Sequence, residues 1–581
     1  MRIPIDRHFR SNDGHSLYYR HWPALRPNAS GAIVLFHRGH EHSGRLQHVV
    51  DELDLPEYAM FAWDARGHGL SFDEHDSSEP SLGTFVKDVD CFVRHISSAH
   101  GFPIEDIAAI GQSVGSVLLA AWAHDYAPRI RCMSLAAPAF QVKLYVPLAR
   151  PALALARRLF GEFHVNSYVK ASALTHDPER IASYQTDPLI RRPISAKVLL
   201  ALYSTADRII ADAQAIQVPT QMLISGSDWV VHRQPQLDFF ARLGSPIKEC
   251  HEFPGFYHDT LGETDRHLAI NKVRDFITTM FKQPPEPDSL LDSDKQGPTK
   301  QEFDLLEKPL PGMSPKALVF RLMRRGLRRA SRLSDGLRLG FKTGFDSGST
   351  LDYVYGNKPS GVTPLGRLID WFYLNSIGWR GIRVRRRSVE SLLHNAIARL
   401  HASGRPIRIL DIAAGHGRYV LSALDGSTEV DHVLLRDYSE INVRKGRALI
   451  HEKGLDAVAE FEQADAFDRE RLAGVEPRPT LGVISGLYEL FPENGPVRNS
   501  LAGVADAIER GGYLVYTGQP WHPQLEMIAR VLPSHRGLQP WVMRRRTQAE
   551  LDQLVEAAGF RKLDQLIDDW GIFTVSIAQR T

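Results

Sequence analysis

The chain has 581 residues, of which 43% are hydrophobic and 24% charged, and its formal net charge is +2. This length exceeds what one hydrophobic core supports, so several domains are expected, and the small net charge gives no general attraction to nucleic acid. Three widely spaced cysteines exclude a disulfide framework and a Cys-rich zinc site, and the lack of a signal segment or long apolar run predicts a soluble cytoplasmic protein.

A segment rich in proline and acidic residues divides the chain near its middle. Residues 283–313 hold six prolines and seven acidic residues against three lysines, a composition that is typical of a linker. Strand-like and helix-like runs alternate on each side of it, which predicts an α/β fold in each half. The predicted division is a first domain at 1–283, a linker at 284–313 and a second half that follows it.

The stretch IAAIGQSVGS places Ser113 between two glycines, where a strand-like run ends and a helix-like run begins. Gly-x-Ser-x-Gly in this context is typical of a nucleophile elbow. Two later strand-like runs end near Asp228 and His258, in the order that α/β-hydrolases use. We therefore predict a catalytic triad of Ser113, Asp228 and His258, with Asp259 and His251 as nearby rivals. The structural alternative is a turn aspartate and a solvated loop histidine.

An oxyanion hole needs two backbone N–H groups, and Val114, directly after the nucleophile, is expected to supply one. The loop in GAIVLFHRGHEHSGR, together with WDARGHGLS further on, resembles the monoacylglycerol lipase and lysophospholipase branch of the α/β-hydrolases, the serine aminopeptidase S33 type. The resemblance implies that Gly39 supplies the other N–H. Arg38 and His40 stand where the family usually has glycine, which predicts a cation near the substrate's acyl oxygen or an anionic group.

The same resemblance implies a helical cap over the active site at about 141–213, which includes the apolar and basic run LYVPLARPALALARRLFGEF. Such a cap suits an acylated substrate with a phosphate or a membrane around it, and it equally suits plain packing on the sheet. His37, His40 and His42 have an alternative interpretation as a metal site. A serine triad leaves a metal no role, so no metal is predicted.

The second half contains IRILDIAAGHGRYVLSAL, a strand, a glycine turn and a helix. The next strand-like run ends at Asp437, 20 residues after Gly417, where a carboxylate can bind both hydroxyls of a ribose. A third run ends at Asp465 beside Ala466, and two more strands and a terminal hairpin follow. A dehydrogenase that binds NAD is the alternative, but no third glycine completes Gly-x-Gly-x-x-Gly.

This order of elements resembles the class I S-adenosylmethionine methyltransferases over roughly residues 385–581. The resemblance implies S-adenosyl-L-methionine as the cofactor, with alanine in place of the first glycine of the first motif. The residues that it assigns to cofactor binding are Asp411, Ala413, Gly415, Gly417, Asp437, Asp465 and Ala466.

Class I methyltransferases bind the methyl acceptor outside the core sheet, and two aromatic-rich segments flank it here, at 349–387 and 517–532. The candidate acceptor-site residues are Tyr353, Tyr355, Asn357, Trp521 and His522. His522 is the candidate base. Each of them equally fits a packed residue of a helix or loop.

Residues 314–384 are predicted to form a basic amphipathic helix and a lid of the methyltransferase. The helix is expected at 316–342, which holds nine Lys and Arg residues against one acidic residue. Such a helix can lie on an anionic membrane, so peripheral association with the inner membrane is predicted. RNA binding and a solvated packed helix are the alternatives, and no specific nucleic-acid partner is expected.

The whole chain resembles bacterial fused proteins of an α/β-hydrolase and a class I methyltransferase. The predicted fold is an N-terminal α/β-hydrolase fold with a helical cap, followed by a Rossmann-like methyltransferase fold. The predicted function is a serine ester hydrolase, similar to lysophospholipase or monoacylglycerol lipase, fused to an S-adenosylmethionine-dependent methyltransferase. Its substrate would be a lipid or another small-molecule ester. The alternatives are an opposed pair of methyl esterase and carboxyl methyltransferase, and a membrane-associated protein with one inactive domain.

Overall fold

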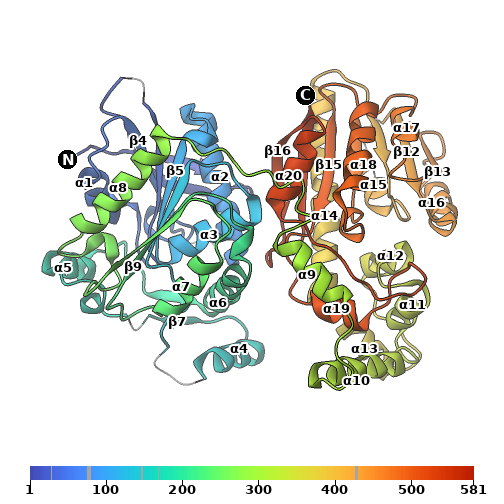
Figure 1. Ribbon diagram of the computed structural model, residues 1–581, viewed down its shortest axis with the longest axis horizontal. Coiled ribbons are helices and arrows are strands. Elements are labelled where there is room, and N and C mark those ends of the chain that lie inside the picture. Colours follow the sequence, from blue (N-terminus) through green and yellow to red (C-terminus); the bar gives the residue numbers. More distant parts are fainter. Residues whose placement is uncertain (28, 75–79, 145–147, 168, 425–429) are drawn as a thin grey trace. The chain divides into compact units, whose positions relative to one another are not determined.

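The computed structural model describes the chain except residues 28, 75–79, 145–147, 168 and 425–429. It divides into two compact units, Met1–Asp288 and Ser289–Thr581, and each is described by itself (Figure 1). Within the described ranges, neither unit has a helix of sufficient length and hydropathy to cross a bilayer.

The first unit is built on a mixed sheet in the order β1-β2-β4-β3-β5-β6-β9-β10. β2 pairs antiparallel with β1 and β4, and the remaining pairs are parallel. The central strands are buried along their whole length, as their unbroken apolar runs require when helices cover both faces. The strands are β1 (Ile5–Arg10), β2 (Ser16–Trp22), β3 (Gly31–Phe36), β4 (Tyr58–Trp63), β5 (Ile107–Gln112), β6 (Cys132–Ala136), β9 (Thr220–Ser225) and β10 (Lys248–Phe253).

Helices α1 and α8 pack on one face of this sheet, where Val49 and Ile277 join Ile33 and Leu35 of β3 in one apolar core. The helices outside the cap are α1 (Gln47–Glu52), α2 (Leu82–His100), α3 (Val114–Tyr126), α7 (Arg233–Arg242) and α8 (His267–Lys282), with short 3-10 turns η1 (Ser43–Leu46), η2 (Gly69–Ser71), η3 (Ile104–Asp106), η5 (Ala213–Ala215) and η6 (Thr260–Gly262). This arrangement is the α/β-hydrolase fold.

Between β6 and β9 the chain leaves the sheet, in the segment for which a cap is predicted. Its elements are α4 (Ala149–Phe160), β7 (His164–Asn166), η4 (Ala171–Ala173), α5 (Pro178–Thr186), β8 (Pro193–Ser195) and α6 (Ala196–Ala211). β7 and β8 form a small antiparallel pair of their own. No side chain of α4 is buried, and Leu155, Leu159 and Phe160 are more than half exposed. The cap segment is therefore mainly helical, and α4 packs only loosely against the rest of it.

The segment predicted as a linker, 284–313, belongs to the second unit from Ser289 onward, so that part of the prediction is wrong. It forms α9 (Pro298–Glu307), whose Leu306 is buried against Leu525 and Ile528 of α19 (Leu525–Val531). The segment is thus anchored to the second unit by an apolar contact.

The acidic residues of this segment find partners far along the chain. Asp294 accepts a hydrogen bond from the N–H of Asn494 at 2.8 Å, and Glu302 accepts one from Arg545 Nε at 2.5 Å. These partners lie more than 190 residues away in sequence, so composition alone could not distinguish a packed segment from a solvated one.

The second unit is built on a sheet in the order β13-β12-β11-β14-β15-β17-β16, in which β17 is antiparallel to both neighbours. The other pairs are parallel, so their carboxyl ends meet at one edge. This is the Rossmann-like class I methyltransferase fold, with the predicted terminal hairpin. The strands are β11 (Arg408–Asp411), β12 (His432–Asp437), β13 (Ala459–Gln463), β14 (Leu481–Ile484), β15 (Tyr513–Gly518), β16 (Phe560–Ile567) and β17 (Thr574–Arg580).

The helices of this unit form layers on the sheet and an additional group below it (Figure 1). Those that follow strands of the sheet are α15 (Arg418–Ala423), α16 (Glu440–Glu452), α17 (Arg469–Ala473), η7 (Tyr488–Leu490), α18 (Asn494–Ala507), α19 and α20 (Gln548–Ala557). The additional helices are α10 (Pro315–Ala330), α11 (Asp335–Thr343), α12 (Gly348–Gly356), α13 (Pro364–Leu374) and α14 (Ile377–Ala402).

Two predicted boundaries in this unit are wrong. The expected helix at 316–342 is two helices, because Ser334 caps α11 through its hydroxyl and also bonds to Asp370. The expected boundary at 384/385 falls inside α14, whose buried residues run from Trp379 to Leu400. One continuous helix therefore joins the additional group to the sheet.

Candidate functional site

The serine elbow lies where β5 meets α3. Ser113 has φ 55° and ψ −112°, a conformation that costs a non-glycine residue about 1–3 kcal/mol. The turn is tight, because a Cβ on Gly115 would lie 2.5 Å from the carbonyl oxygen of Phe36. The sequence therefore folds locally as the strand, turn and helix that the elbow requires.

The three residues of the predicted triad lie together at the carboxyl edge of the first sheet. His258 Nε2 is 2.8 Å from Ser113 Oγ, and His258 Nδ1 is 2.8 Å from Asp228 Oδ2. All three side chains are buried. Asp228 Oδ1 also accepts the backbone N–H groups of Val230 and Val231, at 2.6 and 2.9 Å.

These contacts define the protonation of the triad. Burial raises the pKa of Asp228, but the imidazole of His258 and the hydrogen bonds outweigh it, and the pKa lies below its ordinary value. An ionised Asp228 holds the proton of His258 on Nδ1, which leaves Nε2 to accept the proton of Ser113. The arrangement can therefore activate the serine hydroxyl as a nucleophile.

The two residues predicted for the oxyanion hole adjoin one another. A Cβ on Gly39 would lie 3.3 Å from Cγ2 of Val114. Val114 is the first residue of α3, so its N–H has no partner within the helix. His40, which has φ 69°, is held by a hydrogen bond of Nδ1 to the carbonyl oxygen of Arg191 at 2.8 Å.

The guanidinium of Arg38, predicted near the acyl oxygen, is instead neutralised in a buried ionic cluster. It bonds to Glu41 at 2.6 and 2.8 Å and lies 3.3 Å from Asp259. Burial lowers the pKa of Arg38, but Asp259 and Glu41 outweigh this and raise it overall. Arg38 therefore does not present the free cation to the substrate that the sequence predicted.

Asp259 connects three segments that are distant in sequence, a role that the sequence did not indicate. It accepts hydrogen bonds from Gln112 Nε2 at 2.7 Å and from Arg180 Nε at 3.0 Å, besides its contact with Arg38. Gln112 precedes the nucleophile and Asp259 follows His258, so the only available signal was adjacency to a predicted catalytic residue. Neither Asp259 nor His251, which bonds to Glu249 at 3.0 Å, takes the place of a triad residue.

The histidines considered as metal ligands each have a protein partner. The partners of His37, His40 and His42 are, in turn, the N–H of Ala65, the carbonyl oxygen of Arg191 and the carboxylate of Asp187. Burial lowers the pKa of His37 to about 4. Among the described residues, no group of three His, Cys, Asp or Glu side chains is placed to hold a metal ion.

A cavity of about 300 Å³ lies beside the triad. Trp229, Val230 and Tyr257, each within two residues of Asp228 or His258, line it together with Val169, Lys170, Ser172 and Ala173 of the cap segment. The cavity thus lies between the cap segment and the loops that follow the triad strands, but Ser113, Asp228 and His258 themselves are not among its lining residues.

In the second unit, the glycine turn after β11 is fastened to the end of β12. Gly417 has φ 75°, and a Cβ there would lie 2.4 Å from Leu435, so only glycine fits. The N–H of Gly415 donates to Asp437 Oδ2 at 2.9 Å. Asp437 Oδ1 accepts the Ser439 N–H at 2.8 Å. Burial raises the pKa of Asp437.

Asp411 is buried at the end of β11 with an unfilled hydrogen-bonding position. Its Oδ1 accepts the N–H of Ala413 at 3.2 Å, and its Oδ2 has no partner within ordinary hydrogen-bond distance among the described residues, although the buried hydroxyl of Tyr419 lies close enough to oppose the rise of its pKa. Burial raises the pKa of Asp411 to about 7. A buried acceptor of this kind fits a ligand that brings a hydrogen-bond donor or a positive charge.

The residues predicted at the adenine lie after β13. Asp465 is exposed and its Oδ1 accepts the N–H of Phe467 at 2.9 Å, whereas Ala466 is buried. Because β11, β12 and β13 are parallel, the loops that carry Asp411, Asp437 and Asp465 lie at one edge of the sheet. The structure thus brings the predicted cofactor residues to a common edge.

Four of the five candidate acceptor residues have other roles. Tyr353 donates to Asp370, Tyr355 packs against Arg386, Asn357 caps α12 in a left-handed conformation, and Trp521 packs against Arg545. None of them is among the residues that line the large cavity of this unit, and only His522 is.

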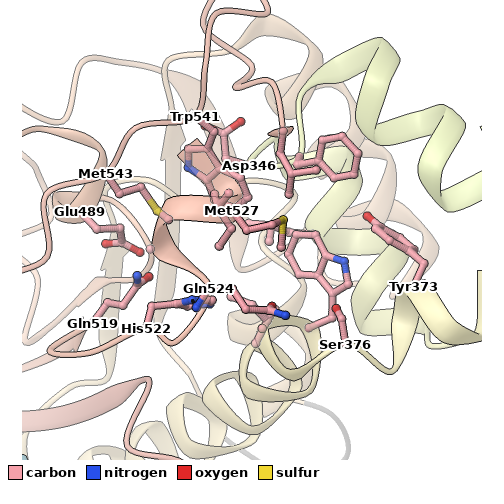
Figure 2. A pocket seen from close by; sticks show the side chains of 18 of the residues that line it. Asp346, Tyr373, Ser376, Glu489, Gln519, His522, Gln524, Met527, Trp541 and Met543 are labelled. Atoms are coloured by element: carbon pink, nitrogen blue, oxygen red, sulfur yellow. Dashed lines mark hydrogen bonds between the residues drawn. The ribbon is translucent and has the colours of Figure 1, made fainter. Parts of the chain in front are cut away.

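This cavity has a volume of about 500 Å³ (Figure 2). Most of its lining is apolar, and Figure 2 shows Glu489, Gln519 and His522 close together at one end. Glu489 follows β14, and Gln519 and His522 follow β15, so this end lies at the same sheet edge as the loops of Asp411 and Asp437.

His522 lines the cavity as a neutral imidazole. Its Nδ1 accepts the N–H of Gln524 at 3.1 Å, and burial lowers the pKa to about 4. A neutral imidazole with an acceptor at Nδ1 carries its proton on Nε2, so His522 is a hydrogen-bond donor there. Its role as a base stays a prediction, and Glu489, Gln519 and Arg385 are lining residues that the sequence analysis missed. The available signal was the place of Glu489 and Gln519 after predicted strands, and that of Arg385 in the aromatic-rich segment 349–387.

Comparisons with known proteins agree with the two folds. Residues 273–580 match the family described as "Putative methyltransferase", and residues 27–265 match the one described as "Serine aminopeptidase, S33". The chain is 57% identical over 580 residues to "Uncharacterized protein YnbC" of Escherichia coli (strain K12), with 100% of this chain and 99% of that protein covered.

The first half has further relatives. It is 25% identical to a "Monoacylglycerol lipase" of Mycolicibacterium smegmatis, over 43% of this chain and 88% of that protein. A crystal structure of Paleococcus ferrophilus monoacylglycerol lipase aligns with a TM-score of 0.41 at 21% identity, over 45% of this chain and 99% of that one. The chain belongs to a family of fused proteins in which an α/β-hydrolase of the S33 type precedes a methyltransferase.

Proposed function

We propose that the chain is a bifunctional enzyme, a serine ester hydrolase for lipid-like esters joined to an S-adenosylmethionine-dependent methyltransferase. The observation that carries the proposal is the complete chain of hydrogen bonds from Ser113 through His258 to Asp228. The cavity beside the triad and the similarity of the first half to monoacylglycerol lipases support an acylated substrate.

In the hydrolysis, Ser113 Oγ attacks the ester carbonyl while His258 Nε2 takes its proton. The N–H groups of Gly39 and Val114 stabilise the oxyanion, and His258 returns the proton to the departing alcohol. A water molecule, deprotonated by His258, then attacks the acyl-enzyme and releases the acid and the free serine. Asp228 keeps the imidazole oriented and stabilises its charged form.

The decisive test of the hydrolase is Ser113→Ala in the full chain. We expect it to abolish hydrolysis of p-nitrophenyl esters and labelling by a fluorophosphonate probe, with Ser98→Ala, an exposed serine of α2, as the matched control. Full esterase activity in Ser113→Ala would contradict the triad. Faster turnover of methyl esters than of long-chain esters would instead favour the opposed pair of esterase and carboxyl methyltransferase.

For the methyltransferase, the chain's own residues provide a fitting cofactor site. Asp437 can accept hydrogen bonds from ribose hydroxyls, and the unpartnered, buried Oδ2 of Asp411 fits a cationic or N–H-bearing group. Bound S-adenosyl-L-methionine would supply an electrophilic methyl group.

Calorimetric titration tests this site. Asp437→Ala should weaken binding of S-adenosylmethionine about tenfold to a few hundredfold, because charge-assisted hydrogen bonds contribute roughly 1.5–3 kcal/mol each. Asp437→Asn should weaken binding as well, because its amide NH₂ group would face one of the backbone N–H groups that the carboxylate accepts. Binding of NAD in place of S-adenosylmethionine by the unsubstituted protein would contradict the proposal.

A second proposal concerns the membrane. Exposed apolar and basic side chains share α10 and α13, and we call them the α10/α13 surface. Its apolar members, each between 48% and 58% exposed, are Leu318, Val319, Leu322, Leu365, Leu368, Trp371 and Phe372. Its exposed arginines are Arg321, Arg325, Arg328 and Arg329. Apolar groups beside cations match an anionic bilayer, so we infer peripheral binding to one.

Vesicle sedimentation of the full chain tests this inference. We expect binding to vesicles that contain phosphatidylglycerol, weaker binding at high salt, and little binding to phosphatidylcholine alone. Leu318→Ser with Leu322→Ser should reduce binding, and Leu268→Ser, on α8 of the first unit, is the control for an exposed leucine. Equal binding to both kinds of vesicle would contradict the role of the arginines.

A further inference from the structure

We propose that the 500 Å³ cavity of the second unit binds the methyl acceptor, and that the acceptor is an amphiphile. Its hydrocarbon chain would occupy the apolar part of the cavity, and its oxygen-rich head group would lie at Glu489, Gln519 and His522. This inference rests on the proposed methyltransferase function and names the substrate class of that site.

The cavity lies where an acceptor must reach the cofactor. In open α/β sheets, ligands bind outside the carboxyl ends of the strands at the point where strand order reverses. Here that point lies between β11 and β14, and Asp411 and Glu489 come from the loops after these two strands. The polar end of the cavity therefore adjoins the loops proposed to hold the cofactor.

The apolar part of the cavity matches a hydrocarbon chain. The apolar residues that line it include Met323, Leu327, Leu337, Phe345, Leu351, Ile369, Phe372, Trp379, Ile382, Met527, Ile528 and Leu532. Protein cores leave few voids larger than a water molecule, so an apolar space of this size indicates a binding site. The acceptor chain would replace water there without needing any hydrogen bond.

The polar end calls for acceptor atoms on the ligand. Gln519 is 5% exposed, and within the described part of the chain its Nε2 has no hydrogen-bond partner. The Nε2–H of His522 is a second donor, because Nδ1 is occupied by the N–H of Gln524. These two buried donors lie beside Glu489, whose carboxylate is paired with Arg385 at 3.4 Å, and they fit a head group with oxygen acceptors.

The cavity shares residues with the helices of the α10/α13 surface. Met323 of α10 and Phe372 of α13 line the cavity, yet they are 40% and 57% exposed. The same helices thus present apolar side chains both to the cavity and to solvent. An acceptor held at a lipid surface by these helices would therefore lie near the cavity.

The experiment uses the full chain with Ser113→Ala, so that esters are not hydrolysed. Saturated fatty acids of 8, 10 and 12 carbons are titrated below their micelle concentrations in the presence of S-adenosylhomocysteine. We expect affinity to rise about threefold to fourfold per methylene, which corresponds to the ~0.8 kcal/mol of burying one CH₂ group. Monoacylglycerols and lysophospholipids of equal chain length then identify the preferred head group.

An exposed leucine outside the α10/α13 surface gives a matched control. Ile369 lines the cavity, whereas Leu305 of α9 is 67% exposed and does not line it. Ile369→Glu should weaken binding of the 12-carbon acid at least tenfold, whereas Leu305→Glu should leave it unchanged. If Ile369→Glu does not fold, Phe372→Glu, at a half-exposed lining residue, should produce the same loss.

The outcomes separate this inference from the proposed function. Affinity that does not depend on chain length, or equal losses for Ile369→Glu and Leu305→Glu, would overturn the chain site. Failure of the unsubstituted protein to bind S-adenosylmethionine would overturn the methyltransferase proposal, and chain-length dependence lost only in Ile369→Glu would still support an amphiphile site.

Discussion

The two units carry sites of opposite character. In the first, the catalytic side chains satisfy one another, since Ser113, His258 and Asp228 form one chain of hydrogen bonds. Around them, Asp259 bonds to Gln112 and Arg180, and Arg38 Nη1 is left without a partner among the described residues. In the second, Asp411 Oδ2 and Gln519 Nε2 are buried without a partner in the described part of the chain. The catalytic chain of the first site is therefore complete as it stands, whereas the second site has hydrogen-bonding positions left for ligands.

The difference follows from the chemistry proposed for each unit. A serine hydrolase makes its nucleophile from its own groups, so preorganisation requires that every bond be made before substrate arrives. A methyltransferase must bind two ligands, and buried groups reserved for them remain unpaired until they bind. The raised pKa of Asp411, about 7, and the lowered pKa of Asp228 express this contrast in electrostatic terms.

The largest expected effect tests the completeness of the first site. Asp228→Asn keeps the shape of the carboxylate but removes the charge that holds the proton on His258 Nδ1. We expect ester hydrolysis to fall by about 10⁴, as for the same change in other serine triads. Binding of S-adenosylmethionine, measured by calorimetry, should not change. Loss of both activities would indicate that the two sites are coupled.

A second prediction concerns the ionic cluster below the triad. Asp259→Ala removes the carboxylate that balances the buried charges of Arg38 and Arg180. Breaking such a cluster costs about 3–5 kcal/mol. Thermal unfolding should show this loss in the first unit. Asp265→Ala, an exposed position in a nearby loop, is the control. Unchanged stability of Asp259→Ala would show that the cluster is dispensable.

A third prediction tests whether 289–313 belongs to the second unit. A chain of residues 289–581 should be more stable than one of 314–581 by about 2–4 kcal/mol, because the shorter one exposes the site of Leu306 and loses the partners of Arg545 and Asn494. Denaturant titration of both chains measures the difference. Equal stabilities would restore the interpretation of this segment as a linker.

The smallest effect concerns pH. Burial lowers the pKa of His37 and His48 to about 4 and that of His68 to about 3, all in the first unit. The unfolded chain binds protons at these residues more readily, so stability of the first unit is lost as pH falls from about 6.5 towards 4.

The pKa shift of Asp411 in the second unit has the opposite effect on stability. Its raised pKa, about 7, adds stability at acidic pH that is lost as pH rises towards 7. Hydrogen exchange followed by mass spectrometry between pH 7 and 4 should therefore show the first unit opening earlier, with a difference of about 1–3 kcal/mol. Simultaneous opening of both units would contradict these assignments.

The extent of sequence-based prediction differed between the two sites for a physical reason. The triad and the cofactor loop lie on strand ends, where local patterns of apolar runs and glycines determine which residues reach the sheet edge. The cavity is made by helices from 315 to 402 and by loops after β14 and β15. Its residues follow no regular spacing in the sequence. The sequence therefore predicts Tyr353 and Asn357 at the acceptor site instead of Glu489 and Gln519.

The sequence by itself determined the two α/β folds and the identity of Ser113, Asp228 and His258 as neighbours, because both depend on local patterns and on chain order. Only the tertiary structure decided the direction of Arg38, the donor state of His522 and the anchoring of residues 289–313. Each of these depends on a partner that is distant in sequence or on burial and backbone geometry around the side chain. Such contacts exist only once the sheet and its helices have packed.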